Sequence, residues 1–442
     1  MSELGKFIRK KRKDQGLRLE DLADEHISTA TISNIERGVP HVNREKISYL
    51  MDKLNLDLDE VSKMLLEDSE NMESMQLKFT AVDTLLSLGK IEKASRFLMN
   101  IPAKTISHHQ ASIHLLKGRA YLQQKDWHKA ERELSDAIRL AERDRYAEKI
   151  NLIALCYLDL ATCRYLQYDL KHALQFIERG IQALKKDRED YQKVRYRLLT
   201  NQIAYLERSG FTDEALKRLN QLWLSLDSIQ ELSVILKMHI IRAKLLRKVK
   251  LYHDAIKCAR KGIQLAVGSY YYEELFHLWM ILGMTYLDLY QLENAEICFA
   301  FVGDLEDQVN SKKEVIRAYC SLSYLYLLKN ELDEAERSAN EAARLSDKHP
   351  KKPIRDYVWI LCGQIEKRRG NWEKAVHCFQ QAIKLANKNE PSSSSLLQSY
   401  VELAECYQKL EKEEQFVETI TKIYRLQKKL HRQEQLSQQW QS

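Results

Sequence analysis

Apolar residues recur at helical spacing through the whole chain, and their grouping changes near residue 76. Up to residue 66 they form short clusters, which predict five short helices. From Gln76 onward they predict longer helices that follow one another in pairs. Between the two patterns, residues 67–75 are polar and acidic. The chain is therefore expected to hold two domains, residues 1–66 and 76–442, separated by a linker at residues 67–75.

The third predicted helix has a surface suited to DNA. Ser28 can accept hydrogen bonds from free N–H groups at the helix start, and Gly38 permits a left-handed exit. Ile32 and Ile35 fall on one inward face. The other faces carry small, hydrogen-bonding or cationic side chains, which can approach a groove without a bulky obstruction. These side chains belong to Thr29, Ala30, Thr31, Ser33, Asn34 and Arg37.

Charge supports a nucleic-acid interface through its distribution. The chain carries a net charge of +7, but residues 1–66 hold 12 Lys and Arg against 12 Asp and Glu. Six of these cations crowd into eight positions: Lys6, Arg9, Lys10, Lys11, Arg12 and Lys13. Such a cluster can face phosphates, although a solvated helix face is the alternative.

In order and spacing, the motifs of this domain resemble the Cro/CI-type (Xre) helix-turn-helix. They are Leu4-Gly5-Lys6-Phe7-Ile8-Arg9, Leu22-Ala23, Ile32-Ser33-Asn34-Ile35-Glu36-Arg37-Gly38 and Leu54-Asn55-Leu56-Asp57-Leu58-Asp59-Glu60. The resemblance implies that the third helix enters the major groove while flanking groups hold phosphates. It implies the DNA-binding residues Arg18, Ser28, Thr29, Ala30, Thr31, Ser33, Asn34 and Arg37.

The sequence departs from this family at two positions, and the carboxylate of Glu36 is not expected to contact DNA. Arg18-Leu19 stands where the family has Ser or Thr followed by Gln, so Arg18 is expected to replace the phosphate contact of that Gln. The turn is one residue shorter than usual, with His26 where Gly is common. Glu36 is expected to pair internally with Arg9 or Arg12, because carboxylates rarely face DNA.

The second pattern is a repeat with an alanine at a fixed position. These marker alanines are Ala94, Ala130, Ala173, Ala215, Ala255, Ala295, Ala335 and Ala375. Twelve residues before each lies a mostly small residue: Val82, Gly118, Ala161, Ile203, Ala243, Gly283, Ser323 and Gly363. Small residues are needed where two helices cross closely. A ninth, degenerate pair has Phe416 at the marker position.

This pattern resembles the tetratricopeptide repeat, with a longer period than the usual motif. The resemblance implies about nine helix pairs in a right-handed superhelix whose first helices line a concave groove. Cations, amides and aromatic rings on these helices suit an extended peptide. The candidate peptide-binding residues are Arg119, Thr162, Arg197, Asn201, Lys237, Lys244, His277, Arg317, Tyr324 and Gln364. A solvated side chain is the alternative for each; Arg197 and Asn201, on adjacent turns of one helix, are preferred.

Composition agrees with an all-α fold and narrows the chemistry. Only 13 Gly and 5 Pro leave few positions for hairpins, so almost no strand is expected. The eight cysteines form no CxxC pair and are expected to be reduced core thiols. No apolar run is long enough to span a bilayer, so a cytoplasmic protein is expected. We find no phosphate loop, metal cluster or nucleophile arrangement, and expect neither enzymatic activity nor a metal or cofactor.

Over its whole length the chain resembles the RRNPP family of Gram-positive peptide-pheromone receptors, most closely the NprR branch. The resemblance implies a quorum-sensing transcription regulator that binds double-stranded DNA and is switched by a short signalling peptide. A homodimer or higher homo-oligomer is expected, with no membrane partner. The alternative is a Rap-like regulator whose repeats bind a response-regulator protein as a phosphatase or inhibitor.

Overall fold

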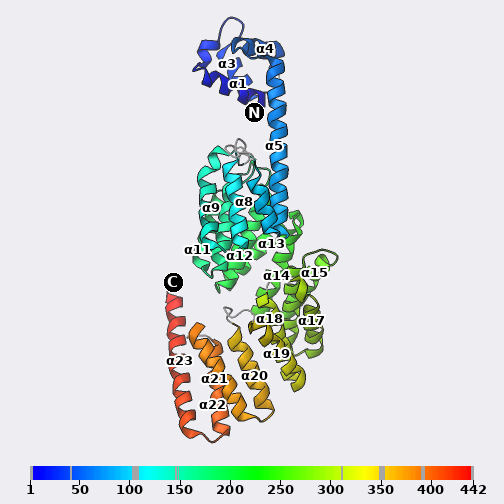
Figure 1. The fold of residues 1–442 in the computed structure, drawn as a ribbon, viewed down its shortest axis with the longest axis vertical. Coiled ribbons are helices and arrows are strands. Elements are labelled where there is room, and N and C mark those ends of the chain that lie inside the picture. The colour runs from blue at the N-terminus through cyan, green and yellow to red at the C-terminus, as the bar shows by residue number, and fades with distance from the viewer. Residues whose placement is uncertain are drawn as a thin grey trace. The chain divides into compact units, whose positions relative to one another are not determined.

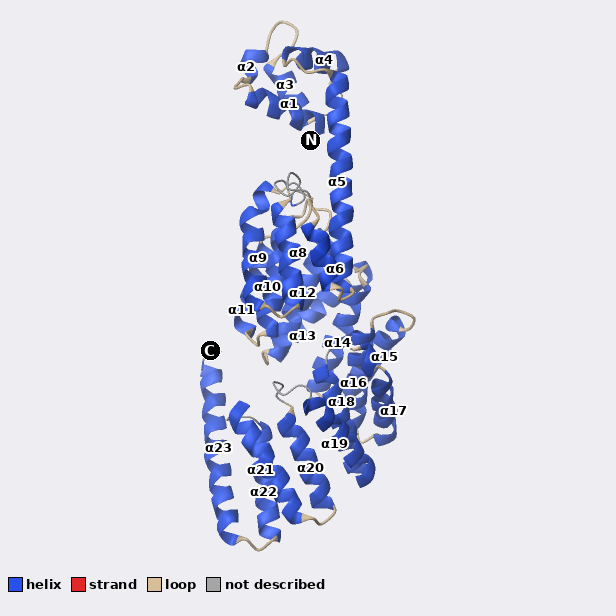
Figure 2. Cartoon of the chain, in the orientation of Figure 1, coloured by secondary structure: helices blue, strands red, loops and turns tan. Residues whose placement is uncertain are grey.

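The computed structural model of the chain is helical throughout the residues that it describes (Figures 1 and 2). These are residues 3–39, 42–101, 109–144, 147, 149–309, 312–347, 354–389 and 394–439. They contain no strand, which confirms the predicted all-α class. Within the same ranges, no helix has both the length and the apolar character needed to cross a membrane. The chain forms two compact units, residues 1–195 and 196–442, which we describe separately.

The first unit begins with five helices at the expected places in the sequence. They are α1 (Glu3–Asp14), α2 (Leu19–Leu22), α3 (Thr29–Arg37), α4 (Arg44–Lys53) and α5 (Leu58–Ser87). Their core contains Ile8, Ile32 and Leu50, each fully buried. Gly5 lets α1 approach α3 closely, since a Cβ there would lie 2.5 Å from the carbonyl oxygen of Ile35.

Helix α5 extends well beyond the predicted end of the N-terminal domain. It is a single helix of 30 residues, and the predicted linker at residues 67–75 lies inside it. The predicted linker is thus a helical connection, and its three Glu and two Met residues are good helix formers. The C-terminal part of α5 buries Phe79 and Val82 against the next helix.

The paired helices follow as the repeat predicts. In the first unit, α5 pairs with α6 (Ile91–Met99), α8 (Gln110–Gln123) with α9 (Trp127–Leu140), and α10 (Leu152–Leu166) with α11 (Leu170–Gln182). The boundary between units falls inside α12 (Tyr191–Arg208), which precedes α13 (Thr212–Trp223). The remaining pairs are α14 (Leu232–Lys248) and α15 (Tyr252–Ala266), α16 (Tyr272–Asp288) and α17 (Leu292–Asp304), α18 (Lys312–Lys329) and α19 (Leu332–Asp347), α20 (Arg355–Arg368) and α21 (Trp372–Asn389), and α22 (Ser394–Lys409) and α23 (Glu413–Gln439).

The marker alanines are the points of closest packing in each pair. All eight have 0% relative exposure, which confirms the register of the repeat. The small residue twelve positions earlier faces a large side chain from the second helix. A Cβ on Gly283 would lie 2.7 Å from the ring of Phe299, and one on Gly363 would lie 2.6 Å from the ring of Phe379. These two crossings therefore require glycine.

Every helix pair also turns in the same way, a feature that the sequence pattern alone did not indicate. The residue five positions before each marker has a positive φ. These residues are Gly89, Lys125, Tyr168, Gly210, Lys250, Tyr290, Asn330 and Gly370, and Glu411 stands five residues before Phe416. The next N–H then closes the first helix, as where Gln291 N donates to Tyr286 O at 2.9 Å. The turn geometry is thus constant although its residue type is not.

Candidate functional site

Helix α3 is capped at both ends as its sequence predicts. Ser28 Oγ accepts a hydrogen bond from Thr31 N at 3.2 Å. Gly38 has a φ of 67° and its N–H bonds to the carbonyl oxygen of Ile35. These caps fix the length of α3 and leave its polar face uncovered within the N-terminal domain.

The candidate DNA-binding side chains on α3 remain open to solvent. Ala30 and Arg37 are exposed, whereas Thr29, Thr31, Ser33 and Asn34 are half-buried. Arg37 donates from its guanidinium to Asn34 Oδ1 at 2.6 Å and to Ser33 O at 3.3 Å. Since these bonds are exposed, a base or phosphate can replace them at little cost in free energy.

Glu36 is the internal partner that the sequence indicates. It is 4% exposed and accepts two hydrogen bonds from Arg12, at 2.6 and 3.1 Å, while Arg9 lies 3.9 Å away. Arg12 also donates to Leu17 O at 2.7 Å. The hydrogen bond that Arg12 donates to Glu36 raises the pKa of Arg12 above its ordinary value. Glu36 therefore joins α1 to α3 and does not face outward.

The turn before α3 is held by a carboxylate that the sequence analysis did not single out. Asp24 accepts hydrogen bonds from His26 N at 2.8 Å, Ile27 N at 2.9 Å and Tyr49 Oη at 2.6 Å. It also forms an ion pair with Lys53. These contacts, led by Lys53 and Tyr49, lower the pKa of Asp24 well below its usual range. Asp24 thereby fixes how α3 leaves the turn.

The cations around α3 lie as follows. Arg18 is exposed at the start of α2, where its backbone N–H donates to Asp21 Oδ2 at 2.7 Å. Arg9, Lys10, Lys11 and Lys13 are exposed along α1, whereas Arg12 is buried. The Lys6 side chain lies outside the described residues. Among the described side chains, the expected basic patch on α1 therefore consists of four exposed cations.

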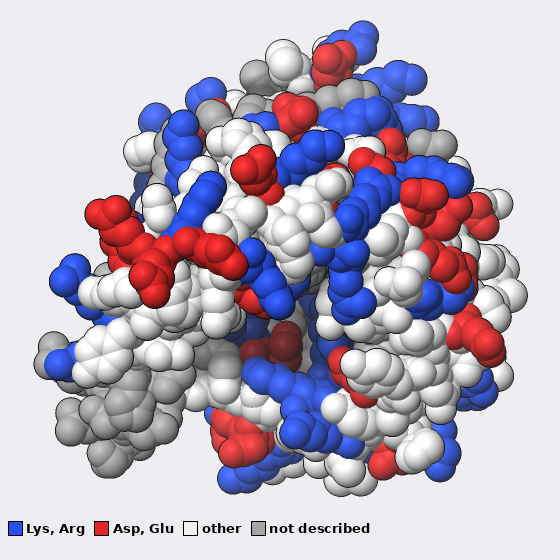
Figure 3. All heavy atoms as spheres, turned by 90° about the horizontal axis from the view of Figure 1, so that it is seen from below, with Lys and Arg blue, Asp and Glu red and all other residues white. Residues whose placement is uncertain are grey.

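In the second unit, six of the candidate peptide-binding residues occupy four neighbouring first helices. They are Arg197 and Asn201 on α12, Lys237 and Lys244 on α14, His277 on α16 and Arg317 on α18. Lys237 donates to Asn201 Oδ1, and Arg197 Nε donates to Glu231 Oε2 at 2.9 Å. On the face drawn in Figure 3, basic and acidic side chains gather in and around a central hollow. We call these six residues, of which Arg197, Lys237, Lys244 and Arg317 are cations, the cationic cluster.

Electrostatics within the cationic cluster favour an anion. The pKa of Lys237 is lowered to about 8, chiefly by burial, with smaller lowering effects from Lys244 and Arg197 and an opposing effect from Glu274. Burial also lowers the pKa of His277 to about 4, with Lys244 and Arg317 adding to the effect. Burial is the main cause of both shifts, so a ligand carboxylate placed beside Lys237 and Lys244 would stabilise their charged forms.

Carboxylates near the cluster were missed by sequence reasoning. Glu274 lies three residues before His277, and Glu314 three residues before Arg317, so each shares a helix face with its neighbour. Burial raises the pKa of Glu274. Their spacing of three residues from His277 and Arg317 is the sequence feature that could have identified these carboxylates.

The other peptide-binding candidates have structural contacts of their own. In the first unit, Arg119 pairs with Asp83 at 2.8 Å and with Asp159 at 2.7 Å, and Thr162 donates to Leu158 O within its own helix. In the second unit, Gln364 donates to Glu402 at 2.8 Å. Tyr324 lies seven residues after Arg317 on the same face of α18 and is 37% exposed.

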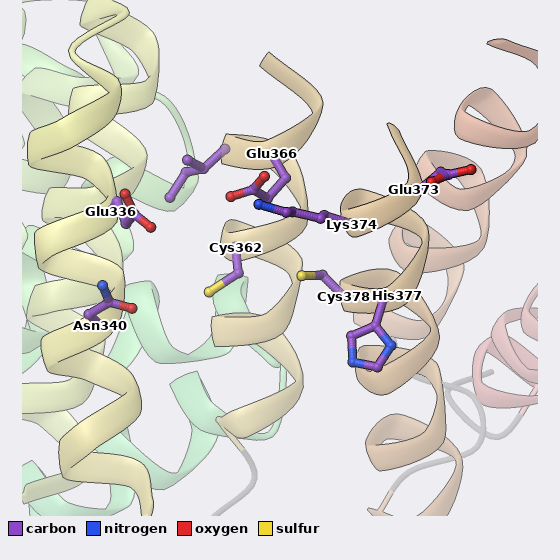
Figure 4. A pocket seen from close by; sticks show the side chains of 9 residues that line it. Glu336, Asn340, Cys362, Glu366, Glu373, Lys374, His377 and Cys378 are labelled. Carbon is purple, nitrogen blue, oxygen red and sulfur yellow. The ribbon is translucent and has the colours of Figure 1, made fainter. Parts of the chain in front are cut away.

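A cavity of about 430 Å³ lies between α19, α20 and α21 (Figure 4). Its lining includes the thiols of Cys362 and Cys378 and the carboxylate of Glu366. Burial raises the pKa of Cys362 to about 12 and that of Cys378 to about 11, so neither is a thiolate at neutral pH. All eight cysteines are free, and all but Cys362 are buried.

Comparison with protein families divides the chain in the same way. A helix-turn-helix family model matches residues 8–61. Tetratricopeptide repeat models match residues 316–349 and 356–389, which contain the α18–α19 and α20–α21 pairs. The chain joins a helix-turn-helix domain to tetratricopeptide repeats. Among curated proteins, the sequence of this helix-turn-helix and tetratricopeptide protein has no match.

Solved structures share this fold over most of the chain. The apo form of the quorum sensor NprR from B. thuringiensis is 15% identical with a TM-score of 0.60, covering 80% of this chain and 99% of NprR. The apo form of RapI is 11% identical with a TM-score of 0.57, covering 81% and 98%. A Rap protein complexed with competence and sporulation factor is 14% identical with a TM-score of 0.54, covering 82% and 99%. The chain thus shares the fold of NprR and Rap structures and carries a helix-turn-helix domain ahead of its tetratricopeptide repeats.

Proposed function

We propose that this protein is a transcription regulator that binds DNA through α3 and is switched by a short peptide held at the cationic cluster. Two features of one chain carry the proposal. Helix α3 is capped at both ends and its polar face is uncovered, and the repeat helices hold a cluster of Lys and Arg side chains. Both are binding surfaces, so the proposed activity is recognition rather than catalysis. A cytoplasmic location, where DNA is accessible, belongs to the same proposal.

DNA recognition would begin with the cations and end with α3. Arg9, Lys10, Lys11 and Lys13, with Arg18, would hold phosphates and so position the domain. Asn34 would then exchange its hydrogen bond with Arg37 for a base edge, since an amide can donate and accept at once. Arg37, released from Asn34, would reach the nearby phosphate.

Peptide recognition would use charge and amide contacts together. A carboxylate of the peptide would lie near Lys237, Lys244 and Arg317, where it would stabilise lysine charges that burial disfavours. Asn201, whose carbonyl oxygen now accepts from Lys237, would become available to the peptide backbone. The peptide would thereby select one arrangement of the first helices over others.

The test is competition binding of the full chain to DNA. We expect a salt-sensitive preference for the DNA upstream of its own coding sequence over random DNA. Asn34→Ala should lower affinity for that site by about tenfold or more while leaving random DNA binding nearly unchanged, because it removes a base contact. Absence of any preference in the unsubstituted protein would refute the DNA-binding half.

The peptide half has its own test. Mass spectrometry of the purified protein should detect a short co-purifying peptide, and Lys237→Met should lose it while Gln364→Ala retains it. A peptide retained equally by both variants would place its site elsewhere.

A second candidate function follows from the fold shared with the two Rap structures, one of which is a complex with competence and sporulation factor. In that case the repeats would bind a response-regulator protein and α3 would not be required. Asn34→Ala would then leave regulator binding and phosphate loss from a phosphorylated regulator unchanged. The two functions are separable by this one variant.

A further inference from the structure

The cavity between α19, α20 and α21 interrupts a packing pattern that other repeats of the second unit keep (Figure 4). Nine residues before the marker position, the first helices α16, α18 and α22 carry Tyr286, Tyr326 and Tyr407. Each of these hydroxyls reaches the second helix of the preceding pair, as where Tyr326 Oη donates to Glu296 on α17 at 3.0 Å. Helix α20 has Glu366 at this position instead, and Glu366 lines the cavity.

The other two hydroxyls bond a polar side chain that recurs in the repeat. Tyr286 Oη accepts a hydrogen bond from Arg260 at 2.6 Å, and Tyr407 Oη accepts one from Gln380 at 3.0 Å. Both partners stand five residues after a marker alanine. Asn340 on α19 has the same position and lines the cavity, and none of the described residues forms a hydrogen bond with its side chain. The amide is therefore placed where a hydroxyl partner would lie.

The apolar lining of the cavity also corresponds to the surroundings of a tyrosine ring. Tyr286 belongs to one core cluster with Leu282 and Cys298. The residues at the same repeat positions two pairs later are Cys362 and Cys378, which line the cavity. Because cysteine is smaller than leucine and no ring is present, this groove keeps an open volume of about 430 Å³. Sites for small molecules typically enclose about 300–1,000 Å³.

The charges around the cavity are matched by opposite charges. Arg369 donates to Glu336 at 2.8 Å and lies 3.8 Å from Glu366. Figure 4 shows the Lys374 side chain pointing toward Glu366, whereas Glu373 points away from the other lining residues. The two thiols are uncharged at neutral pH, as described above. An uncharged ligand therefore fits this lining better than an ion.

We propose that this cavity binds a small uncharged phenol, whose ring occupies the place that a tyrosine ring fills in neighbouring repeats. The ring would contact Ile365, Cys362 and Cys378, and its removal from water drives binding. The hydroxyl would bond the Asn340 amide, which can both donate and accept. The ligand would thereby join α19, α20 and α21. No lining residue belongs to the cationic cluster, so the inference stands whether or not the chain binds DNA or peptide.

Ligand-observed NMR of the full chain titrated with p-cresol tests the site. We expect a Kd of about 1 mM or tighter, as for a small ligand in a partly apolar cavity. Glu366→Tyr supplies the missing ring from the chain itself and should weaken p-cresol binding by at least about tenfold. Glu293→Tyr makes the same change at an exposed position of α17 and should bind p-cresol normally. Circular dichroism should show the same helix content in both variants.

Comparison with toluene tests the contact to Asn340. Toluene has the same ring and methyl group as p-cresol but no hydroxyl, so it should bind about two- to tenfold more weakly. Asn340→Ala should abolish this preference while leaving the affinity for toluene nearly unchanged. No binding of p-cresol to the unsubstituted protein, undiminished binding to Glu366→Tyr, or a preference for p-cresol that survives Asn340→Ala would each overturn the proposal.

Discussion

Glu36 stands next to an exposed arginine in the chain and yet is almost fully enclosed. Its two hydrogen bonds to Arg12 are part of the contact that joins α1 to α3. A carboxylate buried in this way is costly only if its partner is lost, because the remaining charge then has no compensation. The position of α3 therefore depends on a residue that would never touch DNA.

Glu36→Ala should destabilise the helix-turn-helix by about 3 kcal/mol, because it leaves the Arg12 charge buried without a partner. Hydrogen exchange of the amides in α1 and α3 should accelerate by about two orders of magnitude, whereas Arg37→Ala, at an exposed position, should leave it unchanged. Unaltered exchange in Glu36→Ala would mean that the ion pair adds no net stability.

Lys237 gives the second unit a pH dependence. Its pKa is about 8 when folded, against an ordinary 10.5, so the unfolded chain binds more protons between these values. Stability should therefore rise with pH from about 8 to 10.5. Lys237→Met should remove this rise and stabilise the unit at pH 7 by up to about 3 kcal/mol. Urea unfolding followed by tryptophan fluorescence at pH 7 and pH 9.5 measures both effects; identical pH profiles for the two proteins would contradict the assignment.

At the same scale, the sequence indicates on which helix faces the candidate side chains lie but not which side chains they pair with. Asn34 and Lys237 followed from helix faces alone. Asp24 did not, since its role depends on Tyr49 and Lys53, more than 20 residues away in sequence. Arg119 was expected to be available for a ligand, but Asp159, 40 residues later, binds it. A search for carboxylates one repeat away would have found that partner.

Among the helices, a glycine at a crossing point and a glycine away from one should respond oppositely to the same substitution. Gly363→Ala should destabilise by about 1–3 kcal/mol, because the new methyl group would overlap the Phe379 ring. Gly303→Ala, in α17 with nothing within 4 Å of the new methyl group, should stabilise by up to about 1 kcal/mol. Thermal unfolding of both variants checks this contrast. Equal shifts would show that the crossing has room to relax.

The turns offer a similar contrast. Lys250 has a φ of 63°, a conformation in which glycine avoids a cost of about 1 kcal/mol. Lys250→Gly should thus raise the midpoint of thermal unfolding, whereas Lys257→Gly, in the exposed interior of α15, should lower it by a similar amount. A loss of stability in both would refute the turn geometry.

The register of the helix pairs was readable because alanine recurs where two helices touch. The common turn was not, since Lys, Tyr and Glu occupy positions that only Gly or Asn would have marked. The continuity of α5 is not apparent from the sequence because residues 67–75 are polar, although their Glu and Met residues favour helix. Packing patterns identify contacts between helices better than they identify where a helix ends.

For the whole molecule, few positions of the chain were needed to recognise the architecture. Family models match residues 8–61 and two of the repeats, and the fold is shared with NprR and Rap structures at 11–15% identity. Small residues at crossings and one helix-turn-helix are enough to specify such a fold.

The length of α5 affects the rotation of the DNA-binding domain about the helix axis. Because one uninterrupted helix ends the DNA-binding domain and begins the first repeat pair, each residue inserted within 67–75 turns the domain by about 100° and moves it by about 1.5 Å. Two inserted alanines should therefore weaken binding to the upstream DNA, and seven, close to two full turns, should recover most of it. Electrophoretic mobility shifts would show this alternation. A smooth decline of DNA affinity with insert length would instead mean that α5 sets only the distance of the DNA-binding domain from the repeats and not its rotation.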